Sequence, residues 1–505
     1  MDRSKEDLLR RSETSGSDFL QLTVGDAPAG GLSDWLADRF REAIRDGRLP
    51  VGSRLPASRV LARELNVSRG VVTEAYRRLG EEGHVIGHGR RGTIVVGTPV
   101  RTPPARSRPA PVDADAVFAG SPGPEVFDAL RAAPATIDLS PGVPDLAAFP
   151  RAAWLRAERA LLADLANPAL GYGDPRGTQA LRHAVANWLA RTRGIAADPA
   201  DVIVTAGTAQ ALALLMEVLA DAGIREVAVE DPGSLGARQH LHAHRMATPP
   251  VPVDADGIRV GALRATGAPA VLLTPAHQFP TGVVLGGDRR RELRRWVDDG
   301  GLVIEDDYDA EHRYDRPPVP ALRSTFGERV CYAGSVSKLL APALRIGWFL
   351  APPPYRDAVV TAKRFADLGN AALPQLVLAR LMESGEMERH LRLLRRRHRQ
   401  RRDAMIDAIG ARLPDATVHG AAAGLHLTIT FDAPFGDVDL AAASLARGVK
   451  VQPLSWHRQA PGRPGLVLGY AASRPAAIGE AIASIGEALR HVRRRPRGPA
   501  AVGVG

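Results

Sequence analysis

The sequence predicts an α/β protein in which a large, mostly parallel sheet carries helices on both faces and a small helical head precedes it. Beyond residue 135, short apolar runs alternate with helical stretches, as expected for parallel strands that are buried on both sides. Residues 32–97 have a helical period and end in two short strands, and a proline-rich segment, 98–134, separates them from the rest.

Composition limits the class of protein. At 505 residues the chain has room for several core-forming units. Its formal net charge of +10 suits a polyanionic partner without proving one. The single cysteine, Cys331, excludes an internal disulfide and a cysteine-based metal site. The N-terminus lacks the apolar core of a signal peptide, and no apolar run approaches the ~18 residues of a membrane span. We therefore expect a cytoplasmic protein.

The head follows residues 1–31, a polar, glycine-rich segment that we expect to be flexible. Ser33 is the expected cap of a first helix, and a second helix begins at Ser58. After a tight turn, Ser68 caps a third helix that ends near Glu81. The apolar stripe of this third helix consists of Val72, Ala75, Tyr76 and Leu79.

The third helix carries basic and hydroxyl side chains away from its apolar stripe. Arg69, Thr73 and Arg77 recur there, with Gly70 between the first two. Two helices across a tight turn, the second with such an outer face, have helix-turn-helix geometry. An isolated basic face is more often merely solvated, and twelve Arg against eight Asp and Glu give residues 33–97 only +4. The succession of helices and a basic hairpin nevertheless predicts DNA binding. The hairpin strands are His84–Ile86 and Thr93–Val96, and its tip is Gly87–Gly92.

The proline-rich segment 98–134 is expected to be an extended, semi-rigid tether. In sheets of the kind predicted beyond it, ligands bind outside the carboxyl ends of the strands, and the motifs described next lie at such ends. The predicted strands are Val202–Thr205, Val227–Val229, Val271–Thr274, Leu302–Ile304 and Val330–Tyr332.

Lys338 lies just after the last of these strands, among small hydroxyl residues. Burying an ammonium group is costly, but a buried lysine that loses its proton suits Schiff-base chemistry with an aldehyde cofactor. The turn at Gly207 opens a helix whose free backbone N–H groups could hold a phosphate, although many such turns hold none.

The run Glu305–Asp309 crowds four carboxylates at another strand end and favours a cationic partner such as a protonated pyridine nitrogen. A metal site or a solvated acidic loop is the alternative. Arg345 could pair with a phosphate or a carboxylate, or could form a surface salt bridge.

Residues 32–97 resemble the winged helix-turn-helix of GntR-type bacterial regulators. The resemblance implies phosphate contacts from Arg54 and Arg59, groove contacts from Arg69, Thr73 and Arg77, and a wing that carries Arg90 near the minor groove. Ser58, Ser68 and Gly70 belong to the same expected DNA-binding surface. The matching fragments are Gly52–Arg59, Leu61–Ala62, Val67–Arg69, Ala75–Leu79 and Glu82–Gly83.

The remainder resembles the fold-type-I pyridoxal-phosphate enzymes, the aminotransferases, and the whole chain resembles a MocR-type regulator, in which a GntR head is fused to an aminotransferase-like domain. The matching motifs are Ser140–Gly142, Tyr172–Gly177, Glu230–Gly233, His277–Gly282, Glu305–Asp309 and Ser335–Lys338. The resemblance implies a large domain at 135–375 and a smaller α+β domain at 376–492. The arginine-rich end of the chain, 493–505, is expected to be a basic, flexible tail.

The resemblance also implies a role for each motif residue toward pyridoxal 5'-phosphate. Lys338 would form the internal aldimine, Asp306 would pair with the pyridinium nitrogen, and Tyr308 would bond the ring hydroxyl. The choice of Asp306 over Asp307 depends on register. The phosphate would be held by Gly207, Thr208, Ser335, Ser337 and Arg345, with Tyr172 from a second subunit.

Three departures from the enzymes argue against turnover of amino acids. Ser234 and Leu235 stand where an aromatic ring would stack on the cofactor, and Phe279 replaces an asparagine. Leu466–Leu468 occupy the stretch where an arginine would bind the substrate carboxylate. We expect a homodimeric, nucleoid-associated regulator that binds double-stranded operator DNA. Its small-molecule effector would be the cofactor or an amino acid, and vitamin B6 synthesis is one pathway it could control. A working aminotransferase with a DNA-binding appendage is the alternative.

Two charged or metal-binding patterns remain. From Arg389 to Arg402 there are eight Arg and no acid, which suggests either a second DNA-contacting surface or, by a small margin, a solvated helix. His240, His242 and His244 alternate without partner ligands nearby, and we expect no metal site there.

Overall fold

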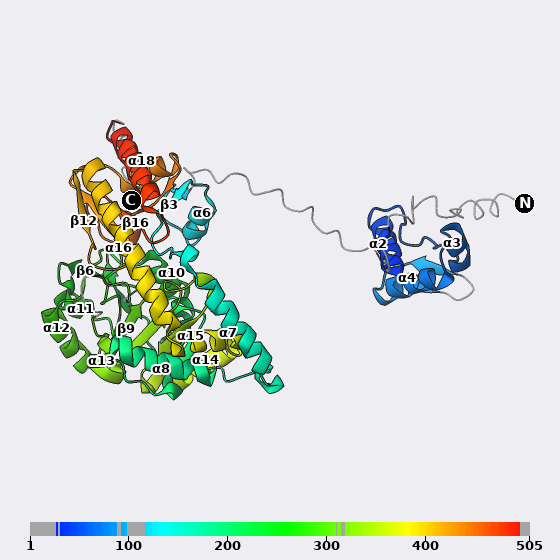
Figure 1. Ribbon diagram of the computed structural model, residues 1–505, viewed down its shortest axis with the longest axis horizontal. Coiled ribbons are helices and arrows are strands. Elements are labelled where there is room, and N and C mark those ends of the chain that lie inside the picture. The colour runs from blue at the N-terminus through cyan, green and yellow to red at the C-terminus, as the bar shows by residue number, and fades with distance from the viewer. Residues whose placement is uncertain are drawn as a thin grey trace, which may run out of the picture. The chain divides into compact units, whose positions relative to one another are not determined.

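The computed structural model describes residues 27–28, 31–87, 92–97, 117–309, 311–314 and 319–494. The chain divides into two compact units, residues 1–110 and 111–505, each of which is described by itself (Figure 1). No helix in the described ranges is both long and apolar enough to cross a membrane.

The N-terminal unit is a three-helix head with a short hairpin. Its elements are α2 (Leu32–Arg45), α3 (Ser58–Glu64), α4 (Arg69–Glu81), β1 (Val85–Gly87) and β2 (Thr93–Val95). The strands pair antiparallel, with Ile86 opposite Ile94. Ser68 caps α4 as predicted, since its hydroxyl accepts a hydrogen bond from the Val71 N–H at 3.4 Å. The expected cap at Ser33 is wrong: α2 begins one residue earlier, at Leu32, after Gly31.

The core of the head confirms the predicted stripe. Val72, Ala75 and Leu79 of α4 are fully buried. Tyr76 is partly buried, because its ring packs edge-on against Phe40 at 5.4 Å and its hydroxyl donates to the Pro56 carbonyl at 2.9 Å. The side of α4 that carries Arg69, Thr73 and Arg77 is therefore left exposed.

The C-terminal unit contains the predicted mostly parallel sheet. Its order is β4-β11-β10-β9-β8-β5-β6-β7. The strands from β10 through β6 are parallel, and β11 and β7 are antiparallel to their neighbours. The bounds are β4 (Ile203–Thr205), β5 (Val227–Asp231), β6 (Pro250–Asp254), β7 (Gly257–Ile258), β8 (Ala270–Leu273), β9 (Leu302–Asp307), β10 (Val330–Ser335) and β11 (Gly347–Leu350).

Helices cover both faces of this sheet, because its strands are apolar on both sides. One face packs on α9 (Thr208–Asp221), α10 (Leu235–Ala243) and α14 (Pro353–Asp367). The other packs on α8 (Gln179–Arg193), α11 (Val260–Thr266), α12 (Gly287–Asp298), α13 (Leu322–Phe326) and α15 (Ala372–Glu383). Helix α7 (Arg151–Asp164) lies against α15.

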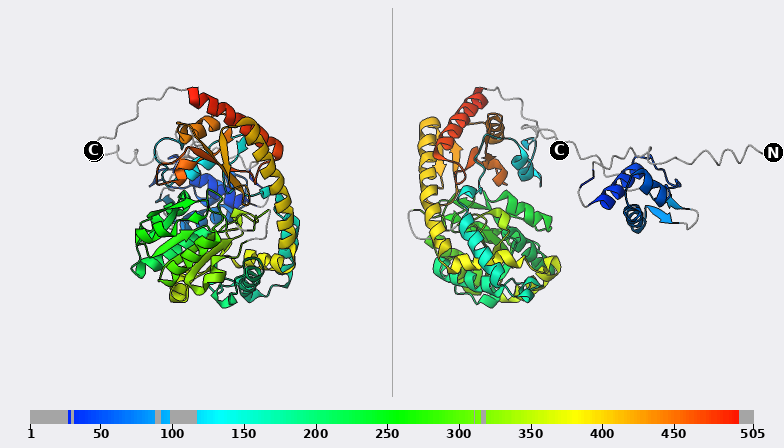
Figure 2. Two further views of the ribbon diagram at one scale, coloured as in Figure 1. Left: turned by 90° about the vertical axis from the view of Figure 1, so that its left-hand side faces the viewer. Right: turned by 45° about the vertical axis from the view of Figure 1, so that its right-hand side comes forward.

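A smaller antiparallel sheet, in the order β12-β13-β16-β15, forms the second domain. Its strands are β12 (Ala416–His419), β13 (His426–Phe431), β15 (Gln452–Pro453) and β16 (Gly465–Gly469). Its helices are α16 (Glu386–Arg412), α17 (Asp437–Leu445) and α18 (Pro475–Arg494). Helix α16 runs along both domains (Figures 1 and 2): Met387 and Leu391 enter the large-domain core, and Met405 and Ile409 enter the small-domain core.

Part of the expected tether is folded, which corrects the prediction for residues 117–134. Phe118 stacks on Trp456 with ring centroids 5.3 Å apart, and α6 (Val126–Ala132) buries Val126 and Leu130 in the small-domain core. Strand β3 (Ile137–Asp138) then pairs with β14 (Val449–Lys450). The high proline content led to the prediction of a tether, although Val126 and Leu130, one turn apart, belong to a short amphipathic helix.

Replacing Phe118 with Ala should destabilise the C-terminal unit by about 3 kcal/mol, because a buried ring would leave a cavity beside Trp456. Chemical unfolding of the full chain, followed by tryptophan fluorescence, measures the change. Arg131→Ala removes an exposed side chain of the same segment and should change stability by less than ~0.5 kcal/mol. Equal effects of the two variants would show that the segment does not contribute to the core.

Candidate functional site

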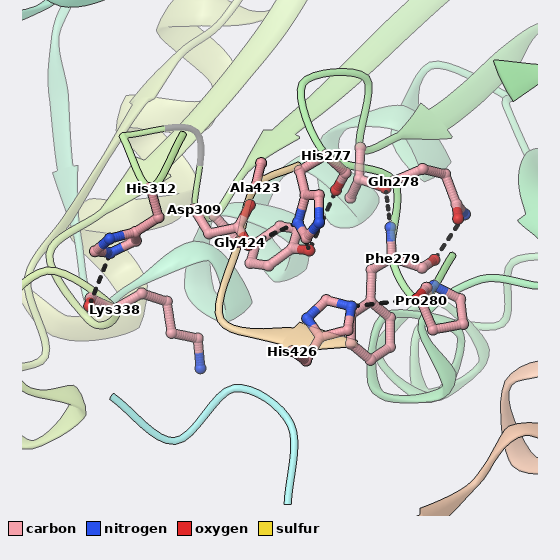
Figure 3. Close-up of polar contacts among 12 residues, drawn as sticks. His277, Gln278, Phe279, Pro280, Asp309, His312, Lys338, Ala423, Gly424 and His426 are labelled. Atoms are coloured by element: carbon pink, nitrogen blue, oxygen red, sulfur yellow. Dashed lines mark hydrogen bonds and ion pairs between the residues drawn. The ribbon is translucent and has the colours of Figure 1, made fainter. Parts of the chain in front are cut away.

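Lys338 lies in the turn that follows β10, inside the C-terminal unit (Figure 3). Its ammonium group donates a hydrogen bond to the Gly142 carbonyl. Gly142 has φ +79°, and a Cβ there would lie 2.9 Å from Lys338 Nζ, so the close approach requires glycine. Burial lowers the pKa of Lys338, while Asp309 and Asp306 oppose that shift. The amine is therefore easier to deprotonate than a free lysine.

The two central carboxylates of the acidic run face different environments. Asp307 is buried and accepts from Arg193 Nε at 2.6 Å and from the Tyr332 hydroxyl at 2.5 Å. Asp306 interacts electrostatically with Lys338, and its Oδ1 is buried without a hydrogen-bond partner. Burial, with Asp307 and Asp309, raises the pKa of Asp306 to about 7. An unpartnered carboxylate oxygen in this position fits a protonated ring nitrogen as its missing partner.

Tyr308 belongs to a hydrogen-bonded group that the sequence did not reveal. Its hydroxyl lies 3.1 Å from His277 Nδ1 and donates to the His277 carbonyl at 3.2 Å. The same Nδ1 lies 2.9 Å from Asp309 Oδ2. His277 also packs against the small domain: a Cβ at Gly424 would lie 1.9 Å from its Cε1. His277 therefore holds Tyr308 and Asp309 in place. Its position in the motif His277–Gly282 was the available signal.

The residues predicted for phosphate binding form a set of hydrogen-bond donors. Gly207 has φ +83° and precedes α9, whose first residue is Thr208. Arg345 lies against this turn: a Cβ at Gly207 would be 3.3 Å from both Arg345 Nη atoms, and Nη2 donates to the Ala206 carbonyl. Helix N-terminal N–H groups beside a guanidinium suit a dianion.

The two predicted serines lie on the same segment as Lys338. Ser335 ends β10 and is buried, and its hydroxyl accepts from the Ser337 N–H at 3.4 Å. Tyr172, by contrast, is 95% exposed. Its proposed contact with the phosphate of a second subunit stays a prediction.

The small domain contributes two histidines beside the site, His426 and His457. Phe279 contacts the rings of His426 and His457, each with centroids 5.0 Å away. His426 Nε2 lies 3.2 Å from the Pro280 carbonyl, and His457 Nε2 lies 3.0 Å from Gln452 Oε1. Burial, as the largest cause, lowers the pKa of both histidines to about 3, so both are neutral at pH 7. No local pattern in the sequence places either histidine at the site.

The residues at two of the three departures, Ser234–Leu235 and Leu466–Leu468, are structural. Ser234 caps α10 by accepting from the Ala237 N–H at 3.2 Å, and Leu235 packs in the small-domain core. Leu466–Leu468 form the fully buried centre of β16. These residues place neither an aromatic ring nor a cation beside the site.

Two other groups of histidines bear on the question of metals. His277, Asp309 and His426 place one ligand atom each within 4.8 Å of one another, a spacing that could hold a metal ion. His277 Nδ1 lies 2.9 Å from Asp309 Oδ2, so these two side chains already pair with each other. His242 bonds Thr248 Oγ1 at 2.7 Å, and His244 bonds the His240 carbonyl at 2.9 Å.

Most arginines in the arginine-rich part of α16 form ion pairs or hydrogen bonds within the C-terminal unit. Arg397 and Arg401 pair with the buried Asp145 at 2.7 and 2.8 Å. Arg395, Arg399 and Arg402 donate to backbone carbonyls of the segments that α16 crosses. Arg392 and Arg396 are exposed, as is Arg389, which pairs with Glu386. Five of the eight arginines are thus engaged within the unit, which the prediction of a solvated helix did not foresee; a second DNA-contacting surface stays a prediction.

The head presents the predicted DNA-contacting residues at its surface. Arg54, Arg59, Ser68, Arg69, Gly70, Thr73 and Arg77 are exposed, and Ser58 is half-buried. Arg69 Nε lies 3.4 Å from Ser58 Oγ, and Thr73 Oγ1 donates to the Arg69 carbonyl at 2.9 Å. Arg77 pairs with Glu74 and Glu81 on its own helix. Arg90 lies outside the described residues.

The Asp306→Asn variant should stabilise the cofactor-free protein at pH 8. The pKa of Asp306 is raised to about 7, so this carboxyl makes the wild type progressively less stable as pH rises from about 4 to about 7. Thermal unfolding of both proteins is measured at pH 4 and pH 8. The free energy of unfolding of the variant minus that of the wild type should increase by on the order of 1–3 kcal/mol between the two pH values. Asp403→Asn, at an exposed position of α16, serves as the control. A stability difference between the two proteins that does not change with pH would contradict the raised pKa of Asp306.

Comparison with known protein families agrees with this architecture. Residues 134–482 match the aminotransferase class I and II family, and residues 32–95 match the bacterial regulatory proteins of the gntR family. Among solved structures, the chain is similar to the Thermus thermophilus α-aminoadipate aminotransferase LysN complexed with N-(5'-phosphopyridoxyl)-L-leucine (26% identity, TM-score 0.65, 71% of this chain and 92% of that one). It is equally similar in sequence to the Pyrococcus horikoshii kynurenine aminotransferase (26% identity, TM-score 0.67, 74% and 94%).

The C-terminal unit is thus an aminotransferase-type domain of the pyridoxal-phosphate class, preceded by a DNA-binding gntR head. The chain is 32% identical over 457 residues to the pyridoxine biosynthesis transcriptional regulator PdxR of Corynebacterium glutamicum, which covers 90% of this chain and 95% of that protein. It is 31% identical over 461 residues to the probable rhizopine catabolism regulatory protein MocR of Rhizobium meliloti (90% and 93%). The chain belongs to the MocR-type transcriptional regulators, and its cofactor is pyridoxal phosphate.

Proposed function

We propose that this regulator uses pyridoxal phosphate, held at Lys338, as its effector or sensing group and has no steady aminotransferase activity. The observation that carries the proposal is the buried, unpartnered Oδ1 of Asp306 beside the Lys338 amine. When bound, the cofactor supplies an aldehyde that reacts with primary amines. Lys338 would hold that aldehyde, Asp306 would keep the ring nitrogen protonated, and Tyr308 would donate to the ring oxygen.

The donors beside Gly207 would fix the phosphate end. The Gly207–Thr208 turn and Arg345 would provide N–H groups, and the Ser335 and Ser337 hydroxyls would complete the set. His277 would orient Tyr308 through its carbonyl and Nδ1. Each of these contacts would involve the cofactor alone, so the cofactor could order the domain without a second ligand.

The residues on the side of the site that a substrate would occupy favour a sensor over a working aminotransferase. Val467 stands in the buried centre of β16, where a carboxylate-binding arginine would be needed. Without that cation, an amino-acid carboxylate loses a bidentate hydrogen-bonded pair and must be desolvated beside neutral groups.

Homodimer formation belongs to the same proposal. The part of the large domain that includes Tyr172 exposes unusually many apolar side chains, and an exposed apolar surface of this kind usually marks a protein interface. The exposed residues are Leu155, Leu162, Leu170, Tyr172, Phe365 and Leu368. Two heads on one dimer would read two half-sites of an operator.

Titration of operator DNA tests the effector role directly. The full-length protein is compared without cofactor, with cofactor, and with cofactor plus each common amino acid. We expect the cofactor alone to change operator affinity by about 5- to 150-fold, the usual range of coupling between two sites. We expect the amino acids to add little. Indifference to the cofactor together with a large amino-acid response would contradict the proposal, as would steady turnover of an amino donor and a keto acid.

A further inference from the structure

Lys363 is a buried lysine that the cofactor site does not use directly. It lies in the last turns of α14, and its ammonium group donates to Asp367 Oδ2 at 2.9 Å, Asn370 Oδ1 at 2.7 Å and Gln210 Oε1 at 3.3 Å. These four residues form the Lys363 cluster. Burial opposes the charge on Asp367, but hydrogen bonds from Lys363 and Gln210 lower the pKa of its carboxyl. A buried ion pair needs all of its partners, so these side chains hold one another in place.

One side of the cluster holds the turn proposed to bind the phosphate. The Ala206 N–H donates to Gln210 Oε1 at 2.7 Å, the same oxygen that accepts from Lys363. Gln210 Nε2 in turn donates to Asp367 Oδ2 at 2.7 Å. Ala206 immediately precedes Gly207, where the proposed phosphate donors begin. A single glutamine side chain therefore connects Lys363 to this turn.

The other side of the cluster holds the chain that follows α14. Asp367 Oδ1 accepts from the Gly369 N–H at 2.8 Å, and Asn370 accepts from Lys363. Between them, Leu368 has φ +56°, a left-handed conformation that disfavours a leucine, and its side chain is exposed. The bonds from the cluster on both sides of Leu368 therefore keep the chain in a conformation that it would not adopt by itself.

This segment belongs to the exposed apolar surface proposed to form the dimer. Phe365, in the last turn of α14, is 85% exposed. Gln375 joins the segment to the stretch that carries Tyr172, since its Nε2 donates to the Asn370 carbonyl at 2.9 Å and its Oε1 accepts from the Thr178 N–H at 2.8 Å. Tyr172, Thr178 and Asn370 line one cleft. The same buried cluster thus supports both stretches of the proposed dimer surface.

We infer that Lys363 is a positioning residue that couples binding of the cofactor phosphate to assembly of the dimer. The inference rests on the proposed function, which supplies the phosphate at Gly207 and the second subunit. A phosphate at the turn fixes its backbone, and the bond from Ala206 to Gln210 passes this restraint to the cluster. The segment after α14 then has fewer conformations to lose when the second subunit covers it. By linkage, the dimer binds the phosphate more tightly than a single subunit does.

Subunit exchange of the full-length protein tests the coupling. Two batches with different fluorescent labels at the N-terminus are mixed, and energy transfer between the labels reports the rate of exchange. The rate is measured without ligand, with pyridoxal phosphate, and with pyridoxal, which has the aldehyde but no phosphate. Each ligand is used at saturation, as judged by the visible absorption. We expect pyridoxal phosphate to slow exchange at least about fivefold relative to pyridoxal, within the usual range of coupling between sites.

The outcomes separate the inference from the proposed function. Equal exchange rates with the two ligands, both of them bound, would overturn the inference and leave the role of the cofactor intact. A protein that takes up no cofactor, or that stays monomeric, would instead overturn the proposed function.

Three substitutions locate the coupling. Lys363→Met removes the ammonium group and keeps the length of the side chain, so the difference between the two ligands should fall below about twofold. Gln210→Met cuts the bond to Ala206, leaves the buried ion pair in place and should have the same effect. Lys450→Met is the matched control, because Lys450 is a buried lysine of β14 that lies 3.8 Å from Asp138. This control should keep the full difference.

The predicted contact of Tyr172 with the phosphate of the second subunit would couple the same two events directly. Tyr172→Phe removes the hydroxyl group of that contact and should keep most of the difference between the ligands. Loss of the difference in Tyr172→Phe, together with its retention in Lys363→Met, would overturn the inference. If Lys363→Met does not fold, as judged by circular dichroism, Gln210→Met decides the question, and an undiminished difference in that variant would overturn the inference.

Discussion

Lys338→Ala should abolish covalent attachment of the cofactor and with it the visible absorption of the loaded protein. Three lysines lie in the described part of the chain, Lys338, Lys363 and Lys450. Lys363 donates to Asp367 at 2.9 Å and to Asn370 at 2.7 Å, and Lys450 lies 3.8 Å from Asp138. Lys338 donates only to a backbone carbonyl among the described residues, and its pKa is lowered. An amine whose pKa is lowered, and which has no hydrogen-bonded carboxylate among the described residues, is the one suited to react with an aldehyde.

Borohydride reduction of the loaded protein, followed by peptide mass spectrometry, should place the cofactor on the peptide that contains Lys338. Lys450→Ala serves as the matched control, because it removes a lysine of the same unit and should leave the absorption unchanged. Persistence of the visible band in Lys338→Ala would assign the cofactor to another amine and contradict the site described above.

Arg69→Ala should weaken operator binding by roughly 1–3 kcal/mol per head and relax the preference for sequence, if its guanidinium reads a base edge. Arg69 is exposed at the first turn of α4, and its contact with Ser58 Oγ at 3.4 Å is long and easily exchanged for a base. Arg77 pairs with two carboxylates on its own helix, so the net gain from its contact with DNA should be smaller.

Salt dependence separates contacts to bases from contacts to phosphates. Arg54→Ala and Arg59→Ala should weaken binding to all sequences alike and flatten the dependence on salt. Arg63→Ala removes the same charge from an exposed position on α3 and is the control for general electrostatics. Operator and scrambled DNA are titrated at several salt concentrations. Unchanged affinity and selectivity in Arg69→Ala would mean that α4 is not the recognition helix.

Local patterns were enough to predict the parts of the fold that depend on neighbours in sequence. The order of helices in the head and the alternation of strands and helices in the large domain follow from periodicity and caps, as at Ser68. The motifs around Lys338 and Gly207 were found because the carboxyl ends of parallel strands share one edge. Residues 117–134 were misjudged because proline content outweighed a short apolar period at Val126 and Leu130.

The small-domain side of the site could not be predicted, because it is formed by contacts between residues far apart in the sequence. His426 and His457 come from β13 and the short turn after β15, more than 80 residues beyond Lys338, and no local pattern brings them to Phe279. The ion pairs of Arg397 and Arg401 with Asp145 likewise depend on the tertiary fold, since a run of arginines by itself does not reveal buried carboxylate partners.

Helix α16 joins the two domains of the C-terminal unit, because it is part of both hydrophobic cores. One continuous helix supplies Met387 to one core and Ile409 to the other, and between them His390 bonds the Leu339 carbonyl at 2.9 Å, next to Lys338. Cleavage between the two domains would cut α16 itself, whereas the boundary between the two compact units falls between residues 110 and 111.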